Sequence, residues 1–172
     1  MYHAFVRRRI GSVFTGELSR GDYPVVVNRT AAGVVHRFPG EGALGGTRHS
    51  RDALRSWFER LFRLFPVLRF EVEDITVAGW PWRTIVTVRW RDWGSAADGQ
   101  PYENAGCEVF ELRWGRATRI VQYLDTKAVH DSLTRMAAAG IREAAAAPIL
   151  DAPERSPEAP ASTAVAPGAM PG

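Results

Sequence analysis

The chain has 172 residues, of which 45% are hydrophobic, and this is enough for one core of ordinary size. The formal net charge is only +3 and, apart from Arg7-Arg8-Arg9, the arginines are scattered, so nucleic acid is not an expected partner. No apolar run is long enough to span a membrane, and the single cysteine, Cys107, excludes an intrachain disulfide. We therefore expect a soluble cytoplasmic protein without a membrane partner.

The N-terminal half of the sequence predicts two helices with a short strand between them. Apolar residues recur at three- and four-residue steps over residues 2–18, which is typical of an amphipathic helix. Residues 23–32 fit either a strand or a helix, and residues 34–38 are typical of a short strand. Ser50 is a good N-cap for a second helix with a wide apolar stripe, and Pro66 ends that helix.

The C-terminal half predicts an antiparallel meander and a last helix. The strand-like runs are rich in β-branched and aromatic residues, turn signals separate them, and they cover residues 67–78, 82–93, 102–114 and 117–125. An alanine-rich helix is expected over about 127–147. Helices gathered on one side of such a sheet make an α+β domain.

The composition changes at Pro148. Six of the eleven prolines lie from there to Pro171, among Ala, Ser, Glu and Gly and without aromatic residues. Such a segment buries too little apolar surface to offset the entropy lost on ordering. We therefore predict one domain over residues 1–147 and a disordered Ala/Pro-rich tail over residues 148–172.

The hairpin formed by the last two strands contains most of the candidate site. Gly115-Arg116 is typical of a two-residue type II′ turn, which fixes the register of the strands. Side chains alternate with period two, so one face of the hairpin carries every second pair. The predicted pairs on that face are Trp114 with Ala117, Phe110 with Val121, Glu108 with Tyr123, and Gly106 with Asp125.

This register places Asp125 beside apolar side chains, with space for a ligand over Gly106. A carboxylate in such surroundings is a usable general acid or base near neutral pH. A nearby Tyr123 or Asn104 could donate a hydrogen bond to an oxygen that gains charge. Glu108 and His36 are the other polar candidates.

Each of these residues also has a structural interpretation. A strand-end aspartate often caps the following helix, and Asp125 directly precedes one. Glu108 and Tyr123 could form an exposed cross-strand pair, and His36 could be a core histidine. His36 and His49 lack metal-ligand spacing, and no glycine-rich loop carries a P-loop lysine. We therefore predict neither a metal site nor a cofactor.

Four segments, in this order and spacing, resemble one protein superfamily: Gly21-Asp22, His36-Arg37-Phe38-Pro39, Arg51 to Phe58, and Tyr123-Leu124-Asp125. They are similar to the SnoaL-like members of the nuclear transport factor 2-like (NTF2-like) superfamily over roughly residues 1–135. The resemblance implies a cone: a curved antiparallel sheet of about four long strands plus a short strand, wrapped by about three helices around a cavity. It also implies a homodimer formed through the sheet.

In polyketide cyclase and ketosteroid isomerase relatives, a cavity carboxylate moves protons on a carbon next to a carbonyl group, and Asp125 matches the cyclase aspartate by position. Arg89-Trp90-Arg91-Asp92 does not match convincingly the Arg-x-Asp arrangement of epoxide hydrolase relatives. The resemblance thus predicts a cofactor-free isomerase, cyclase or hydrolase-like enzyme on a hydrophobic small molecule, with Asp125 and His36 catalytic. Candidate substrate-binding residues are Tyr123, Asn104, Glu108, Phe110, Val121 and Trp57, the last most simply a core residue. The alternative is a non-catalytic ligand-binding or dimerisation module.

Overall fold

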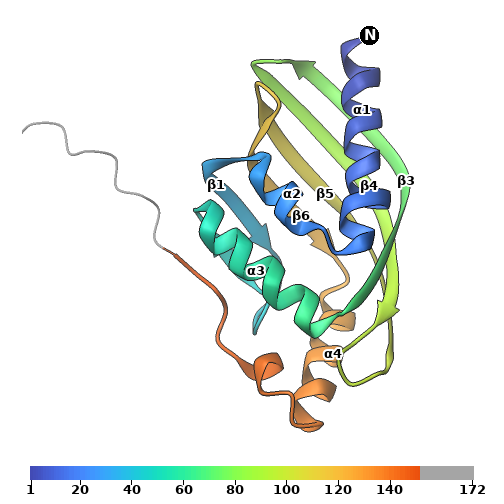
Figure 1. The fold of residues 1–172 in the computed structure, drawn as a ribbon, viewed down its shortest axis with the longest axis vertical. Helices are drawn as coiled ribbons and strands as arrows, with labels where there is room; N and C mark the ends of the chain where they lie inside the picture. The colour runs from blue at the N-terminus through green and yellow to red at the C-terminus, as the bar shows by residue number, and fades with distance from the viewer. Residues whose placement is uncertain (152–172) are drawn as a thin grey trace, which may run out of the picture.

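The computed structural model describes residues 1–151, and its largest feature is a curved six-stranded sheet (Figure 1). The strand order is β2-β1-β6-β5-β4-β3; β1 runs parallel to β6, and all other neighbours are antiparallel. The α+β class and the four long strands are confirmed, with two further strands in place of one. The strands are β1 (Thr30–Phe38), β2 (Gly46–Arg48), β3 (Val67–Trp80), β4 (Arg83–Ser95), β5 (Pro101–Arg113) and β6 (Arg116–Leu124).

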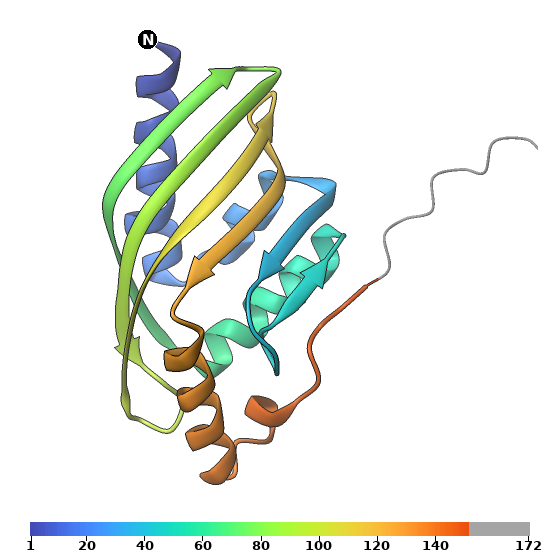
Figure 2. The same ribbon diagram turned by 180° about the vertical axis from the view of Figure 1, so that it is seen from behind.

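The helices cover one face and one end of this sheet. Figures 1 and 2 show α1, α2 and α3 on one face and α4 below the end of β6. Four α-helices replace the expected three, because the ambiguous segment forms a short helix before β1 begins. The helices are α1 (Tyr2–Ser12), α2 (Tyr23–Asn28), α3 (Arg51–Leu64) and α4 (Thr126–Ala138).

Local sequence signals determine where two of the helices begin and end. Ser50 caps α3 as predicted, because its Oγ accepts a hydrogen bond from the backbone N–H of Ala53 at 3.1 Å. The first helix continues beyond Ser12 as a π-helical turn, Val13–Glu17, and a 3-10 turn that ends at Gly21. Gly21 adopts φ 74°, a left-handed conformation that favours glycine at a helix end. The π-helical turn positions one wall of the site described below.

The register predicted for the last hairpin is wrong by one residue. The two turn residues are Trp114 and Gly115, with φ 50° and 76°, so that Arg113 pairs with Arg116. Positive φ at both positions is typical of a type I′ turn rather than type II′. Thr118 then forms an extra residue on β6, a bulge beyond which each β5 residue pairs one position away from its predicted partner.

The true register turns a different set of β6 side chains toward the helices. Phe110 pairs with Ile120 and Glu108 pairs with Gln122, so beyond the bulge the even-numbered residues of β6 point inward. Val121 and Tyr123 therefore project from the opposite face, and the Tyr123 residue is 58% exposed. The sequence therefore predicts correctly which β5 side chains face the helices, but it predicts the wrong set for β6.

The chain after α4 doubles back along β2 and the start of α3 (Figure 2). The carbonyl oxygen of Ile149 accepts a hydrogen bond from Arg48 Nε at 3.1 Å, and the Asp151 carboxylate accepts one from Ser50 Oγ at 2.5 Å. These contacts continue past residue 147, where the sequence places the domain boundary. The rest of the predicted tail, residues 152–172, lies outside the described residues. Within residues 1–151, no helix is long and apolar enough to cross a membrane.

Candidate functional site

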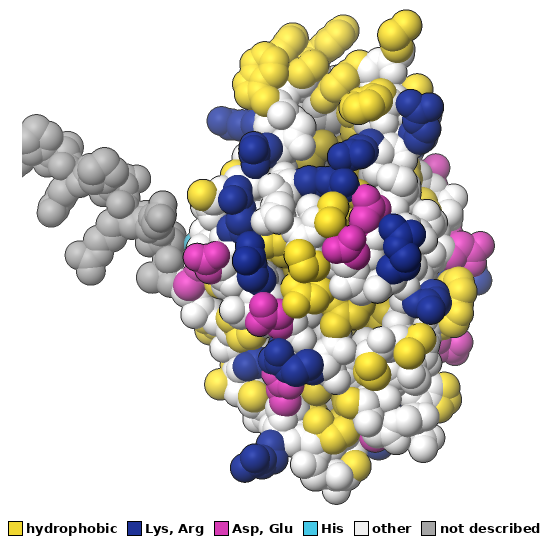
Figure 3. Space-filling view, viewed as in Figure 1, with side chains coloured by type: hydrophobic (Ala, Val, Ile, Leu, Met, Phe, Trp, Pro, Cys, Tyr) yellow, Lys and Arg dark blue, Asp and Glu magenta, His cyan; other side chains and the backbone are white. Residues whose placement is uncertain are grey.

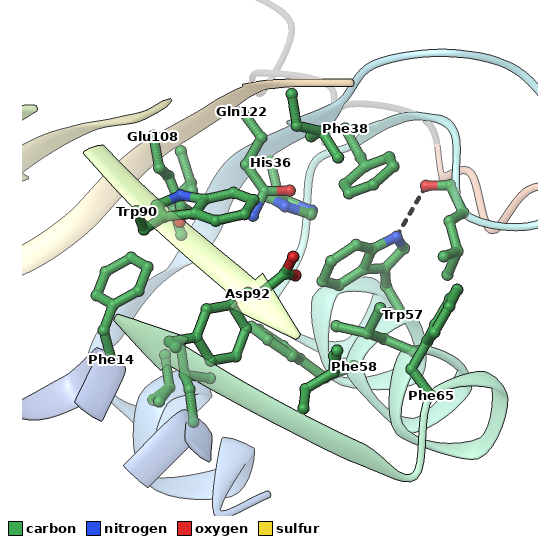
Figure 4. A pocket seen from close by; sticks show the side chains of 18 of the residues that line it. Phe14, His36, Phe38, Trp57, Phe58, Phe65, Trp90, Asp92, Glu108 and Gln122 are labelled. Atoms are coloured by element: carbon green, nitrogen blue, oxygen red, sulfur yellow. Dashed lines mark hydrogen bonds between the residues drawn. The ribbon is translucent and has the colours of Figure 1, made fainter. Parts of the chain in front are cut away.

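A narrow cavity of about 60 Å³ lies between the helices and the inner face of the sheet (Figure 4). It has room for only a few water molecules. Its walls are mostly aromatic and aliphatic side chains from the two helical turns that follow α1, from α3 and from the strands. The polar side chains on its wall are His36, Asp92, Tyr102, Glu108 and Gln122.

Asp92 projects from β4 into the middle of this cavity (Figure 4). The side chain is buried, and this burial raises the pKa of its carboxyl group to about 7, although backbone N–H groups, that of Asn104 among them, oppose the shift. Oδ1 of Asp92 has no hydrogen-bond partner within the described part of the chain. At neutral pH this carboxyl group is close to half ionised, as a general base or acid requires.

Glu108 is the second buried carboxyl group, and it comes from the neighbouring strand β5. Burial raises its pKa to about 8, and an interaction with Gln122 opposes this shift. At neutral pH Glu108 is therefore mostly protonated and can donate a hydrogen bond, while Asp92 is partly charged. Two buried carboxyl groups with raised pKa values thus share one cavity wall.

His36 projects from β1 and is held in one tautomer. Its Nδ1 lies 2.8 Å from Nη1 of Arg48, and because a guanidinium group only donates, Nδ1 accepts and the ring proton is on Nε2. Burial, together with the positive charge of Arg48, holds the pKa of His36 well below 6.5. His36 is therefore neutral, and the ring packs edge-on against Trp57 with centroids 4.5 Å apart.

Arg48 is itself completely buried beneath the site. It donates hydrogen bonds to the carbonyl oxygens of Gly45, at 2.8 Å, and Ile149, at 3.1 Å. Burial lowers its pKa to about 10, so it keeps its charge at neutral pH. Arg48 positions His36 and does not line the cavity.

Besides Asp92 Oδ1, two polar atoms on the wall have no hydrogen-bond partner among residues 1–151. Trp90 Nε1 and Gln122 Oε1 are buried without a hydrogen bond to any described residue. The indole of Trp90 lies over Gly106, where a Cβ atom would come within 2.9 Å of the ring. The space that the sequence assigns to a ligand at Gly106 is therefore filled by Trp90.

A larger apolar groove of about 650 Å³ adjoins this cavity, between α1 and the β5–β6 hairpin. The cavity and the groove share the lining residues Val13, Phe14, Val26, Phe110 and Ile120. The rings of Phe14 and Phe110 pack edge-to-face with centroids 6.1 Å apart. Phe14 comes from the π-helical turn that follows α1. This aromatic pair forms part of the wall between the polar cavity and the apolar groove.

The sequence profile of the SnoaL-like domain matches residues 12–120, which include α2, α3 and strands β1 to β5. The chain belongs to the SnoaL-like domain family. None of the curated protein sequences matches it.

Solved structures share the fold of this SnoaL-like protein at low identity. An NTF2-like protein of unknown function from Burkholderia pseudomallei is 21% identical, with a TM-score of 0.58, over 76% of this chain and 90% of its own. PrhC from Penicillium brasilianum is 17% identical, with a TM-score of 0.64, over 76% and 87%. A candidate SnoaL-like polyketide cyclase from Jannaschia is 20% identical, with a TM-score of 0.55, over 70% and 85%. These likenesses show the fold alone.

Asp125 does not reach the cavity of this SnoaL-like protein. Its Oδ1 accepts hydrogen bonds from the backbone N–H groups of Lys127, at 2.8 Å, and Ala128, at 3.3 Å. The residue is exposed at the N-terminus of α4, so the capping interpretation describes its contacts.

Asn104 also has a structural set of contacts. Its Nδ2 donates to Tyr102 Oη and to the carbonyl oxygen of Asp125, each at 3.0 Å. Its Oδ1 accepts from the backbone N–H groups of Ala105, at 2.7 Å, and Asp125, at 3.2 Å. The side chain is thereby committed to holding the junction of β6 and α4 against β5.

The structure brings together His36, Glu108, Phe110 and Trp57 on the cavity wall, whereas Asp125, Asn104, Tyr123 and Val121 lie outside it. Sequence reasoning missed Asp92, Trp90 and Gln122. Asp92 had a detectable signal, because strand alternation places it on the same face as Val86, Val88 and Trp90. Within residues 1–151, no three His, Cys, Asp or Glu side chains are grouped as metal ligands.

Proposed function

We propose that this SnoaL-like protein binds a hydrophobic carbonyl compound and moves a proton on the carbon next to the carbonyl group. Asp92 takes the role that the sequence assigned to Asp125. The observation that carries the proposal is the buried carboxyl group of Asp92, which faces the cavity with a pKa of about 7 and an unpartnered oxygen.

The other polar groups of the cavity can stabilise the negative charge that forms on the substrate oxygen. When Asp92 takes a proton from carbon, the electron pair of the C–H bond moves toward the carbonyl oxygen, which becomes an enolate oxygen. The Nε2–H of His36, the Nε1–H of Trp90 and the protonated Glu108 are the donors available to that oxygen. Return of the proton from Asp92 to another carbon completes an isomerisation. In a cyclisation the enolate carbon instead bonds to a second carbonyl carbon of the same molecule, and the oxygen of that carbonyl takes the proton from Asp92.

The shape of the site limits which part of a substrate enters the cavity. A volume of about 60 Å³ admits a carbonyl group and its nearest carbons, not a complete ring system. The adjoining groove of about 650 Å³ can hold the apolar remainder, if the rings of Phe14 and Phe110 move apart. The substrate class that fits is an elongated apolar molecule with its reactive carbonyl at one end.

The narrowness of the cavity favours one alternative, a non-catalytic module that binds an apolar ligand in the groove alone. In that case ligand binding would not depend on the protonation of Asp92. The homodimer predicted from the resemblance stays a prediction, and light scattering of the purified protein tests it.

Deuterium exchange tests the catalytic proposal without knowledge of the natural substrate. A panel of elongated apolar ketones is incubated with the protein in deuterated buffer, and the loss of the protons next to the carbonyl is followed by NMR. We expect the wild-type protein to accelerate exchange, and Asp92→Asn to lower the rate at least about 100-fold. Asp125→Asn is the matched control and should exchange at the wild-type rate.

Two outcomes would contradict this assignment. An equal loss of exchange rate in Asp92→Asn and Asp125→Asn would show that the effect is not specific to the cavity. Absence of exchange in the wild-type protein, together with tight binding of the same ketones to both variants, would favour the non-catalytic module. Circular dichroism of each variant separates loss of chemistry from loss of folding.

A further inference from the structure

Three tryptophans gather at the tips of the two long hairpins. Trp80 and Trp82 stack at the β3–β4 turn with centroids 5.9 Å apart, and Trp114 at the β5–β6 turn lies 6.5 Å from Trp82. All three are between 57% and 73% exposed. Figure 3 shows hydrophobic side chains gathered at this end of the molecule, where α1 also begins. We call Trp80, Trp82 and Trp114 the tryptophan tip.

Backbone contacts tie the parts of the tryptophan tip together. The backbone N–H of Trp114 donates to the carbonyl oxygen of Pro81 at 2.6 Å, which joins the two turns. His3 Nε2 donates to the carbonyl oxygen of Gly79 at 2.7 Å, which joins α1 to the first turn. Trp114 has φ 50°, a conformation that is unfavourable for a bulky side chain. The fold thus holds this ring in solvent at a position where asparagine or glycine is preferred.

The charge around the tryptophan tip has one sign. Residues 1–16, 75–85 and 112–118 contain no aspartate or glutamate, although the whole chain has 19. None of the arginines in these segments forms an ion pair with a carboxylate of the described chain. They are Arg7, Arg8, Arg9, Arg83, Arg113 and Arg116.

We propose that the tryptophan tip and its arginines dock on the surface of an anionic lipid membrane. Tryptophan is favoured at the boundary between lipid headgroups and acyl chains, and arginines beside it are attracted to anionic headgroups. A second copy of this chain is a poorer occupant, because a two-fold contact through the tip would set arginines against arginines. Nucleic acid is also poorer, because the faces of Trp80 and Trp82 are partly occupied by stacking on each other.

The position of the tip beside the apolar groove gives this docking a use. Pro81 and Trp114 line the groove, and so do Phe5 and Arg9 on the opposite side. A lipophilic molecule could therefore pass from the membrane into the groove without crossing water. This use rests on the proposed function, whereas the docking itself does not, and Asp92→Asn should dock like the wild-type protein.

Vesicle flotation of the full chain tests the docking. One set of vesicles contains phosphatidylcholine alone, and the other contains about a third phosphatidylglycerol. We expect binding to the anionic vesicles only, with a blue shift of tryptophan fluorescence and with release when salt is added. The triple variant Trp80→Ala, Trp82→Ala, Trp114→Ala should bind at least about tenfold more weakly.

Two matched controls keep the test specific. Trp93→Ala removes another exposed tryptophan, 47% accessible, away from the tip and should bind normally. Arg83→Glu at the tip should weaken binding severalfold, whereas Arg142→Glu, the same charge change near the opposite end, should not. If the triple tryptophan variant fails to fold, the comparison of Arg83→Glu with Arg142→Glu still tests whether the tip binds the vesicles.

Three results would overturn the proposal. The first is no binding of the wild-type protein to anionic vesicles at low salt. The second is equal weakening by the tip variants and their controls. The third is a concentration-dependent dimer, or tighter binding to an oligonucleotide than to vesicles, that the tip variants abolish, since the tip would then serve a protein or a nucleic acid.

Discussion

Asp92 and Asp125 lie on either side of Asn104, and their carboxylates have opposite environments. Both line one surface depression between β4, β5 and the start of α4. Asp92 turns inward, away from water, and its Oδ1 accepts no hydrogen bond from any described residue. Asp125 turns outward and uses its oxygen on two backbone N–H groups. Burial and an oxygen without a hydrogen-bond partner therefore make a carboxylate suitable as a general acid or base. Its position near the end of a strand does not.

The largest expected difference between the two aspartates is in the pH dependence of stability. The folded protein raises the pKa of Asp92 to about 7 from an ordinary 3.8, so the folded state holds this proton more tightly than the unfolded state. Its contribution to stability is therefore present below about pH 4 and is lost as the pH rises toward 7. Asp92→Asn removes this loss.

Urea unfolding of wild type and Asp92→Asn at about pH 4 and about pH 9 measures the effect. The variant should gain on the order of 4 kcal/mol relative to wild type between the two pH values, because one pKa unit corresponds to about 1.4 kcal/mol. Asp125→Asn should show no such gain. A pH-independent difference for Asp92→Asn would mean that its carboxyl group titrates normally and is hydrated.

A second difference concerns Gly106, which the sequence placed beside Asp125 as space for a ligand. An added Cβ would lie 2.6 Å from the carbonyl oxygen of Tyr123 and 2.9 Å from the ring of Trp90. Gly106→Ala should therefore lower the free energy of unfolding by about 2 kcal/mol and shift the fluorescence of Trp90. Gly99→Ala, at a turn where a Cβ meets nothing within 4 Å, shows the cost of left-handed backbone alone. If Gly106→Ala left the free energy of unfolding unchanged, there would be open space at this position after all.

The sequence predicts elements whose signals are local. The helix after Ser50 is one, because its cap, its apolar stripe and the proline that ends it all lie within seventeen residues. Four long strands followed from runs of β-branched and aromatic residues between turns. The inward face of β5, with Glu108 and Phe110, followed from the same alternation.

The features that could not be predicted depend on the exact turn geometry and on contacts between residues far apart in the sequence. Trp114 occupies a left-handed turn position that favours other residues, and the bulge at Thr118 adds one more residue, so the register of β6 could not be read from Gly115. The parallel pairing of β1 with β6 places His36 opposite Ile120, and nothing local indicates it. Asp92 was within reach of the alternation argument, yet no single motif marks it.

The smallest effect belongs to Asp125 itself. Because its side chain satisfies two orphan N–H groups at the start of α4, Asp125→Ala should lower the free energy of unfolding by about 1 kcal/mol. Asp125→Asn keeps an acceptor oxygen and should cost only a few tenths of a kcal/mol. Urea unfolding at one fixed pH measures both, and the exchange rate on ketones should be unchanged in each. If Asp125→Ala instead stopped exchange while leaving stability intact, the carboxylate that caps α4 would also reach the substrate, and the two aspartates would share one site.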